Sequence, residues 1–224
     1  MSDTGRLPAC PGPAPAQACM PAVPDGVEAL ILDFDGTLAD TAPGNERALR
    51  AALQPYGIDL DPGWYGQHVG LSIHDLLAAL PGGHSLPHTE VIARSRANLM
   101  AAMHTIEPVA CVLALLRSAR RAGLPCAIAS NASRILVEPG LDALGLRDEF
   151  AAVVTREDVI RAKPDPALFA EAARRLGIAP ERCLGVDDAP EGIASARAAG
   201  MRVITVIDGH LILADEVPQP KGAA

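Results

Sequence analysis

The sequence contains few aromatic residues, very few lysines and no long run of apolar residues. Aromatic side chains make up 3% of the 224 residues, which leaves little surface on which nucleic-acid bases could stack. The formal net charge is −8 and the pI is near 5.2, so the chain lacks the basic surface that binds nucleic acid or an anionic membrane. No segment approaches the roughly 20 apolar residues of a membrane span. We therefore expect no nucleic-acid partner and no membrane partner.

The N-terminal segment also lacks the pattern of a secretory signal. Residues 1–26 are rich in proline and alanine and have no apolar block behind a basic start. We expect a disordered tail over residues 1–26 and a cytoplasmic protein that is a monomer or a weak dimer. The five cysteines show no metal-ligand spacing, so they indicate no zinc site.

Five short apolar runs predict a parallel sheet. They are continuous rather than alternating, as in strands that helices cover on both faces. Helical patterns separate the later runs, which predicts an α/β fold: a Rossmann-like parallel sheet sandwiched by helices. The runs cover 29–33, 125–129, 151–154, 183–187 and 202–206, and the helical patterns cover 109–122, 133–144, 166–176 and 190–199.

A long segment without a strand-like run separates the first two of these strands. Helical pieces occur within it at 45–53, 73–80 and 88–104. We therefore predict a small helical cap over residues 42–105, inserted after the first strand and lying over the sheet edge. The α/β core would comprise 27–41 and 106–207, and residues 208–224 would form a loose C-terminal tail.

Two acids, Asp33 and Asp35, follow the first predicted strand. Ligands of open parallel sheets bind at the carboxyl ends of the strands, and alternation points both side chains the same way. Gly36 allows a sharp turn that brings backbone N–H groups near an anion. The simpler alternative is an acid pair that only caps a turn.

The second strand ends in Ser130 and Asn131. A hydroxyl and an amide at a strand end, just before a helix, form a good phosphate cradle. The alternative is an ordinary helix cap, with Ser133 as the capping residue.

The fourth strand ends in two adjacent acids, Asp187 and Asp188. Adjacent acids repel one another when they are buried, and hard oxygen ligands near a phosphate suit Mg²⁺. Two solvated acids in a loop are the alternative.

Lysine is so rare that its position is informative. Lys163 and Lys221 are the two lysines among 19 basic residues, and Lys221 lies in the predicted tail. A compact ammonium fits between a phosphoryl oxygen and a carboxylate, where a planar guanidinium does not. A single lysine could also stand there by chance.

These elements, in this order, resemble those of the haloacid dehalogenase superfamily, in the branch that contains β-phosphoglucomutase and small sugar-phosphate phosphatases. The resemblance covers about residues 27–206. Its motifs are Asp33-Phe34-Asp35-Gly36-Thr37-Leu38, Ser130-Asn131, Lys163-Pro164-Asp165-Pro166 and Gly185-Val186-Asp187-Asp188.

The resemblance implies three catalytic residues: Asp33, Asp35 and Lys163. Asp33 would be the nucleophile that forms an aspartyl-phosphate. Asp35 would protonate the leaving alcohol and then activate water. Lys163 would offset the charge that sets a carboxylate against a phosphate dianion.

The same resemblance implies a phosphate site and a Mg²⁺ site. The phosphate-binding residues would be Gly36, Ser130, Asn131 and Lys163. The metal ligands would be Asp33, the backbone carbonyl of Asp35, Asp187 and Asp188.

Departures from the family pattern narrow the function. Asn45 stands where the mutase has a hinge histidine, and Ile73 stands where it has an arginine for the distal phosphate. Both differences weaken a mutase interpretation. The cap positions most relevant to specificity are Asn45, Arg47 and His74.

The sequence therefore predicts a Mg²⁺-dependent phosphatase that hydrolyses a small phosphorylated metabolite, a sugar phosphate, through an aspartyl-phosphate. One alternative is a phosphotransferase of the β-phosphoglucomutase type. A second is a receiver-like phospho-acceptor module, although a receiver places its lysine after both acid motifs and has no long helical insertion.

Overall fold

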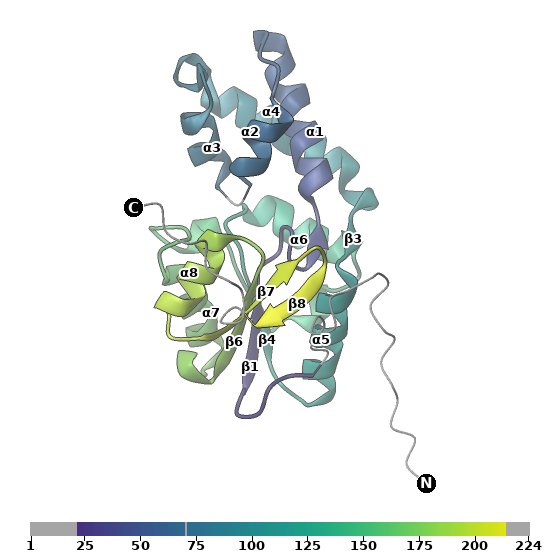
Figure 1. The fold of residues 1–224 in the computed structure, drawn as a ribbon. Helices are drawn as coiled ribbons and strands as arrows, with labels where there is room; N and C mark the ends of the chain where they lie inside the picture. The colour runs from purple at the N-terminus through teal and green to yellow at the C-terminus, as the bar shows by residue number, and fades with distance from the viewer. Residues whose placement is uncertain (1–21, 70, 214–224) are drawn as a thin grey trace.

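The computed structural model describes residues 22–69 and 71–213. A six-stranded sheet, ordered β5-β4-β1-β6-β7-β8, forms its centre (Figure 1). All neighbouring strands are parallel except β7 and β8. The strands are β1 (Ala29–Leu32), β4 (Cys126–Ala129), β5 (Ala152–Val154), β6 (Cys183–Asp187), β7 (Arg202–Ile207) and β8 (His210–Leu213). This mostly parallel sheet confirms the predicted α/β fold of Rossmann type.

Helices cover both faces of the sheet. Alternate residues of β1 point to opposite sides: Leu30 and Leu32 enter the core beneath one pair of helices, and Ala29 and Ile31 the core beneath the other. Both faces are therefore apolar, which explains why the strands read as continuous apolar runs. The first pair is α5 (Ala110–Arg121) and α6 (Arg134–Ala143), and the second is α7 (Ala167–Leu176) and α8 (Pro190–Ala198).

The expectation of a loose tail from residue 208 is wrong at its start. Asp208 and Gly209 both have positive φ, 49° and 76°, and form a tight turn that joins β7 to β8. An Asp-Gly pair between apolar runs is a strong hairpin signal, because both residues tolerate this backbone conformation. Residues 214–224, like residues 1–21 of the predicted N-terminal tail, lie outside the described part of the chain.

A helical subdomain is inserted between two short antiparallel strands, β2 (Ala39–Asp40) and β3 (Glu107–Pro108). Its helices are α1 (Ala42–Leu53), α2 (Pro62–Gln67), α3 (Ile73–Ala79) and α4 (His88–Ala102). They bury an apolar core of their own, which includes Leu53, Leu77 and Val91. In residues 22–69 and 71–213, no helix is long and apolar enough to cross a bilayer.

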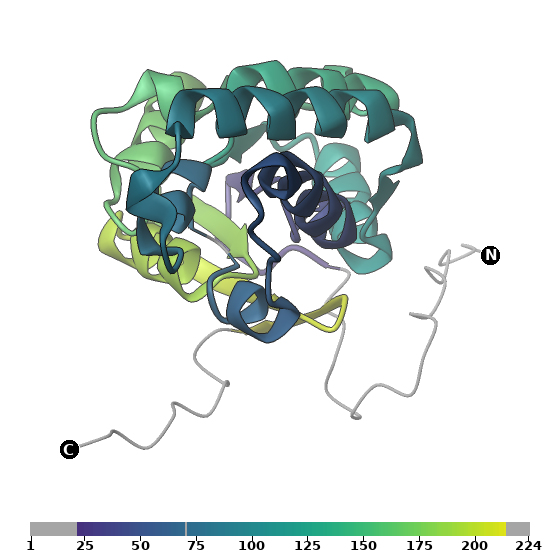
Figure 2. The same cartoon turned by 90° about the horizontal axis from the view of Figure 1, so that it is seen from above.

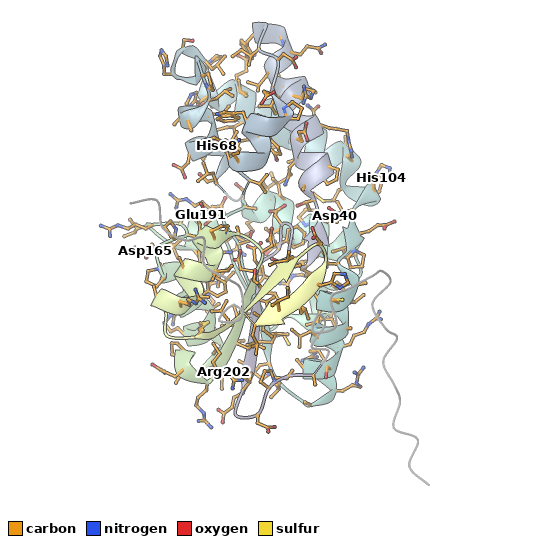
Figure 3. All side chains as sticks on the ribbon, viewed as in Figure 1. Asp40, His68, His104, Asp165, Glu191 and Arg202 are labelled. Carbon is orange, nitrogen blue, oxygen red and sulfur yellow. The ribbon has the colours of Figure 1, made fainter. Side chains whose placement is uncertain are left out.

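The subdomain lies over the carboxyl ends of the parallel strands. Arg202, the first residue of β7, lies at the end of the core far from the subdomain, whereas Asp40 lies where the two parts join (Figure 3). The view from above looks through the subdomain onto the strand ends (Figure 2). The fold thus encloses the edge of the sheet at which ligands of open α/β sheets bind.

Candidate functional site

Three adjacent strands deliver polar side chains to one point at this edge. β1 pairs with β4 on one side and with β6 on the other, so Leu32 lies beside both Ile128 and Val186. The chain then continues into Asp33 from β1, Ser130 from β4 and Asp187 at the end of β6. These side chains are almost fully buried, with exposed fractions of 6%, 1% and 1%. Sheet register alone therefore brings together residues far apart in the sequence.

Lys163 lies between two of these acids. It belongs to the loop between β5 and α7, and its Nζ donates to Asp33 Oδ1 at 2.5 Å and to Asp187 Oδ2 at 2.8 Å. The lysine side chain is only 4% exposed. Burial acts to lower the pKa of Lys163, but the charges of Asp187 and Asp33 outweigh burial and raise it. The lysine is therefore held as an ammonium between the two carboxylates.

Burial has the opposite effect on the nucleophile candidate. It raises the pKa of Asp33 well above its usual value, and the neighbouring acids add to this, although the Lys163 ammonium opposes it. A carboxylate here needs further positive charge to remain ionised beside a phosphate.

Asp188, next to Asp187 in the sequence, contacts the segment that follows Asp33 and Asp35. Its Oδ1 accepts a hydrogen bond from Thr37 Oγ1 at 2.8 Å. Gly36, with φ of +77°, approaches so closely that a Cβ there would lie 2.4 Å from Asp188 Oδ2. Only glycine allows this close approach of the backbone to the Asp188 carboxylate.

The three acids fit a divalent cation. Asp33, Asp187 and Asp188 each offer one oxygen, and these oxygens lie within 4.8 Å of one another. Burial, together with the charge of Asp187, raises the pKa of Asp188 to about 6, as expected for an acid group whose charge lacks compensation. Hard carboxylate oxygens are the ligands that Mg²⁺ prefers.

Asp35 is held from the helical subdomain. Its Oδ1 accepts from Thr41 Oγ1 at 2.6 Å and from Asn45 Nδ2 at 3.3 Å. Thr41 immediately precedes α1 and Asn45 lies in its first turn. The side chain is thus fixed by α1 and lines the cavity.

Ser130 and Asn131 both line the cavity, with additional local contacts. Ser130 Oγ accepts from the backbone N–H of Ala132 at 3.1 Å, and Asn131 Oδ1 accepts from the backbone N–H of Lys163 at 2.9 Å. Asn131 therefore also positions the lysine loop. Ser133 occupies the N-cap position of α6 but makes no side-chain cap hydrogen bond. Glu157 accepts from the backbone N–H of Arg134 instead.

A cavity of about 530 Å³ opens from these residues toward the helical subdomain. Of the three cap positions named for specificity, Asn45 and His74 line this cavity and Arg47 does not. Arg47 lies two residues beyond Asn45 on α1, which places it on the opposite, exposed side of the helix. The acids, Lys163, Ser130 and Asn131 also line this single cavity.

Sequence reasoning missed several site residues. Thr37 lies within the motif of the first strand and could have been recognised as a partner for an acid. Thr41 carried no comparable signal, and neither did Arg96 and Arg156, which line the cavity from α4 and from the loop after β5.

Paired acids, a buried lysine and a carboxylate cluster, at the ligand edge of a Rossmann-like sheet beneath a helical subdomain, define a phosphoryl-transfer enzyme. The profile of the haloacid dehalogenase-like hydrolases matches residues 27–200, and the chain belongs to this family. Several of its relatives are named as phosphatases, and the chain is a phosphoric monoester hydrolase. Family membership does not support the receiver-like alternative.

The matches to named relatives and to solved structures extend over most of the chain. Fructose-1-phosphate phosphatase YqaB of Escherichia coli (strain K12) is 33% identical over 189 residues, which cover 79% of this chain and 95% of the relative. Hexitol phosphatase A of the same organism is 30% identical over 190 residues, 79% of this chain and 82% of the relative. The structure of CbbY from Rhodobacter sphaeroides in complex with phosphate has a TM-score of 0.71 at 26% identity, covering 80% of this chain and 86% of CbbY.

Proposed function

We propose that the protein hydrolyses a small phosphorylated metabolite in a Mg²⁺-dependent reaction, through an aspartyl-phosphate on Asp33. The observation that carries this proposal is the position of Lys163 between Asp33 and Asp187, with Asp188 in the same carboxylate cluster. A lone buried carboxylate would repel a phosphate dianion. The ammonium reduces this repulsion and leaves the carboxylate able to attack.

In the first step, an oxygen of Asp33 attacks phosphorus and the bond from phosphorus to the ester oxygen breaks. Asp35 donates its proton to the departing alkoxide, which leaves as an alcohol. Ser130, Asn131 and backbone N–H groups near Gly36 hold the transferring oxygens. The product of this step is the phosphorylated Asp33.

In the second step, water attacks the phosphorus of the aspartyl-phosphate. Asp35, now ionised, takes the proton from the water, and the bond from phosphorus to Asp33 breaks. Inorganic phosphate leaves, and both aspartates return to their starting states. Asp35 is available for both steps because Thr41 and Asn45 hold its side chain at the cavity.

Mg²⁺ would be held by Asp33, Asp187, Asp188 and the backbone carbonyl of Asp35. When bound, it supplies positive charge against the phosphoryl oxygens. The raised pKa values of Asp33 and Asp188 and the Gly36 approach support this ligand set.

The substrate class in this proposal is a sugar phosphate. The names of two relatives, a fructose-1-phosphate phosphatase and a hexitol phosphatase, support it. The cavity volume of about 530 Å³ suits a small metabolite.

The test is a phosphate-release assay on a panel of sugar phosphates, with Mg²⁺ and with a chelator, for the wild type and Asp33→Asn. We expect release that needs both Mg²⁺ and Asp33. Release by Asp33→Asn at the wild-type rate would overturn the nucleophile assignment. Interconversion of two sugar phosphates without net release of phosphate would favour the mutase alternative.

A further inference from the structure

The proposed phosphate-binding residues, Ser130, Asn131 and Lys163, form one corner of the cavity, here called the phosphate corner. Two arginines line the cavity outside this corner. Arg96 comes from α4 of the helical subdomain, and its Nη2 donates to Ser133 Oγ at 2.5 Å. Arg156 comes from the loop after β5, and its Nη1 donates to the backbone carbonyl of Val159 at 3.0 Å. Both residues are half-buried. The catalytic scheme above uses neither of them.

Both guanidiniums bond only neutral oxygens. Within residues 22–69 and 71–213, neither forms an ion pair with a carboxylate. Arg50, Arg134 and Arg175, in contrast, each pair with acids. A half-buried guanidinium with unused N–H donors favours a charged acceptor, and two of them in one cavity concentrate positive potential there.

One acid shares this part of the cavity without neutralising it. Glu157 accepts from the backbone N–H of Arg134 at 3.1 Å and so caps α6. It is a single negative charge beside two positive ones, and it is exposed. Arg96 contacts Ser133 Oγ and the backbone of Arg156 contacts the Ala132 carbonyl, so both arginines lie at the loop 130–133, and this arginine corner of the cavity holds two positive charges against the one negative charge of Glu157.

The loop 130–133 links this corner to the phosphate corner. Asn131 bonds the Lys163 backbone at one end, and Ser133 bonds Arg96 at the other. Between them, the Ala132 carbonyl accepts from the backbone N–H of Arg156 at 3.2 Å. Residues three apart along a chain are separated by at most about 11 Å, so one small molecule can reach both corners.

We propose that Arg96 and Arg156 bind a second anionic group of the substrate, so that the preferred ester carries a carboxylate or a second phosphoryl group on its alcohol side. This inference rests on the proposed phosphatase function and narrows its substrate class to sugar phosphates and related esters with a second acidic group. Because Arg96 belongs to the subdomain and Arg156 to the core, such a group would also hold the two parts together over the substrate.

Matched pairs of esters test the inference. 3-Phosphoglycerate carries a carboxylate where glycerol 3-phosphate carries a hydroxymethyl group, and 6-phosphogluconate carries one where the open-chain form of glucose 6-phosphate carries an aldehyde. Glucose 1,6-bisphosphate and glucose 1-phosphate differ only in a second phosphoryl group. We expect kcat/KM to be at least about tenfold higher for the acidic member of at least one pair, mainly through a lower KM.

Variants of the two arginines test whether they cause the preference for the ester with a second acidic group. Arg96→Gln and Arg156→Gln should each reduce it at least about threefold, by raising KM for the acidic ester and leaving the neutral ester nearly unchanged. Arg94→Gln is the matched control, because Arg94 lies on the same helix but pairs with Glu90 at the surface. It should leave both esters unchanged.

Calorimetric binding of the same pairs to Asp33→Asn measures recognition apart from turnover. Equal affinity for both members of every pair, including no binding of either, would overturn the second anionic subsite. A preference that survives in Arg96→Gln and Arg156→Gln would overturn the assignment to these residues. Failure of the phosphatase proposal would look different: acidic esters would bind preferentially, and none would release phosphate in an Asp33-dependent way.

Discussion

Asn45, on the first helix of the inserted subdomain, donates a hydrogen bond to Asp35, on the loop after the first strand of the sheet, at 3.3 Å. Thr41 reinforces this link at 2.6 Å. The proposed general acid is therefore positioned by the part of the molecule that closes the cavity. The position of the Asp35 side chain therefore depends on how the helical subdomain packs over the sheet.

Loss of this link should affect the chemical step more than binding. In Thr41→Val and Asn45→Ala, Asp35 loses a donor, so we expect kcat to fall about tenfold with little change in KM. Steady-state kinetics on a substrate with a poor leaving group provide the measurement. Arg47→Ala, on the exposed side of the same helix, is the control and should behave as the wild type. A rise in KM alone would show that these residues serve substrate binding instead.

Asp188 should make the metal-free protein sensitive to pH. Burial raises its pKa from 3.8 to about 6, so its contribution to stability is present at low pH and is lost as pH rises through about 6. Without metal, Asp188→Asn should therefore raise the free energy of unfolding at pH 8 by on the order of 2 kcal/mol. The variant should also lose stabilisation by Mg²⁺.

Thermal melts at pH 5 and pH 8, with Mg²⁺ and with a chelator, measure both effects. In the wild type, Mg²⁺ should stabilise more at pH 8, because the metal binds the ionised carboxylate. An Asp188→Asn protein that is stabilised by Mg²⁺ as fully as the wild type would contradict the role of Asp188 as a ligand.

Removal of the Lys163 ammonium should destabilise the fold as well as the reaction. In Lys163→Met, Asp33 and Asp187 would remain buried without their shared cation, a change that costs about 3–5 kcal/mol for buried pairs. We expect kcat to fall at least about 100-fold, and Lys163→Arg to restore neither property, because a planar guanidinium does not fit between the two carboxylates. Denaturant unfolding and phosphate release check this. Full stability of metal-free Lys163→Met would contradict the assigned pairing.

Gly36 should be required for metal binding beyond its backbone conformation. Gly36→Ala places a Cβ 2.4 Å from Asp188 Oδ2, whereas Gly57, at a similar φ of +71°, has nothing within 4 Å. Both substitutions should cost about 1–2 kcal/mol of stability from the positive φ. Only Gly36→Ala should weaken Mg²⁺ binding, measured by titration calorimetry. Equal Mg²⁺ affinity in the two variants would show that the close approach of Gly36 to Asp188 is not needed for metal binding.

The sequence predicted the sheet and most of the acid cluster because both follow from local patterns. Continuous apolar runs marked the buried strands, and strand ends marked Asp33, Ser130 and Asp187, which the register of β1 with β4 and β6 then brings together. The strand at His210–Leu213 was missed because the Asp-Gly turn before it was not recognised.

The subdomain side of the cavity could not be predicted in the same way. Which residues of a helix face a cavity depends on how that helix packs against the others. Asn45 and Arg47 are two residues apart, yet only Asn45 reaches the site. Arg96 meets Ser133 across two separate parts of the fold, a contact that no local pattern encodes.

Phosphorylation of Asp33 can be observed by intact-protein mass spectrometry with peptide mapping. Asp35→Asn, mixed with acetyl phosphate and Mg²⁺ and quenched in acid, should accumulate the adduct, because this activated donor needs no acid for transfer while water lacks its base. We expect one phosphoryl group on the peptide that contains Asp33, and none in the Asp33→Asn/Asp35→Asn double variant. An adduct on another residue, or turnover of acetyl phosphate without any adduct on Asp33, would contradict the assignment of Asp33 as the nucleophile.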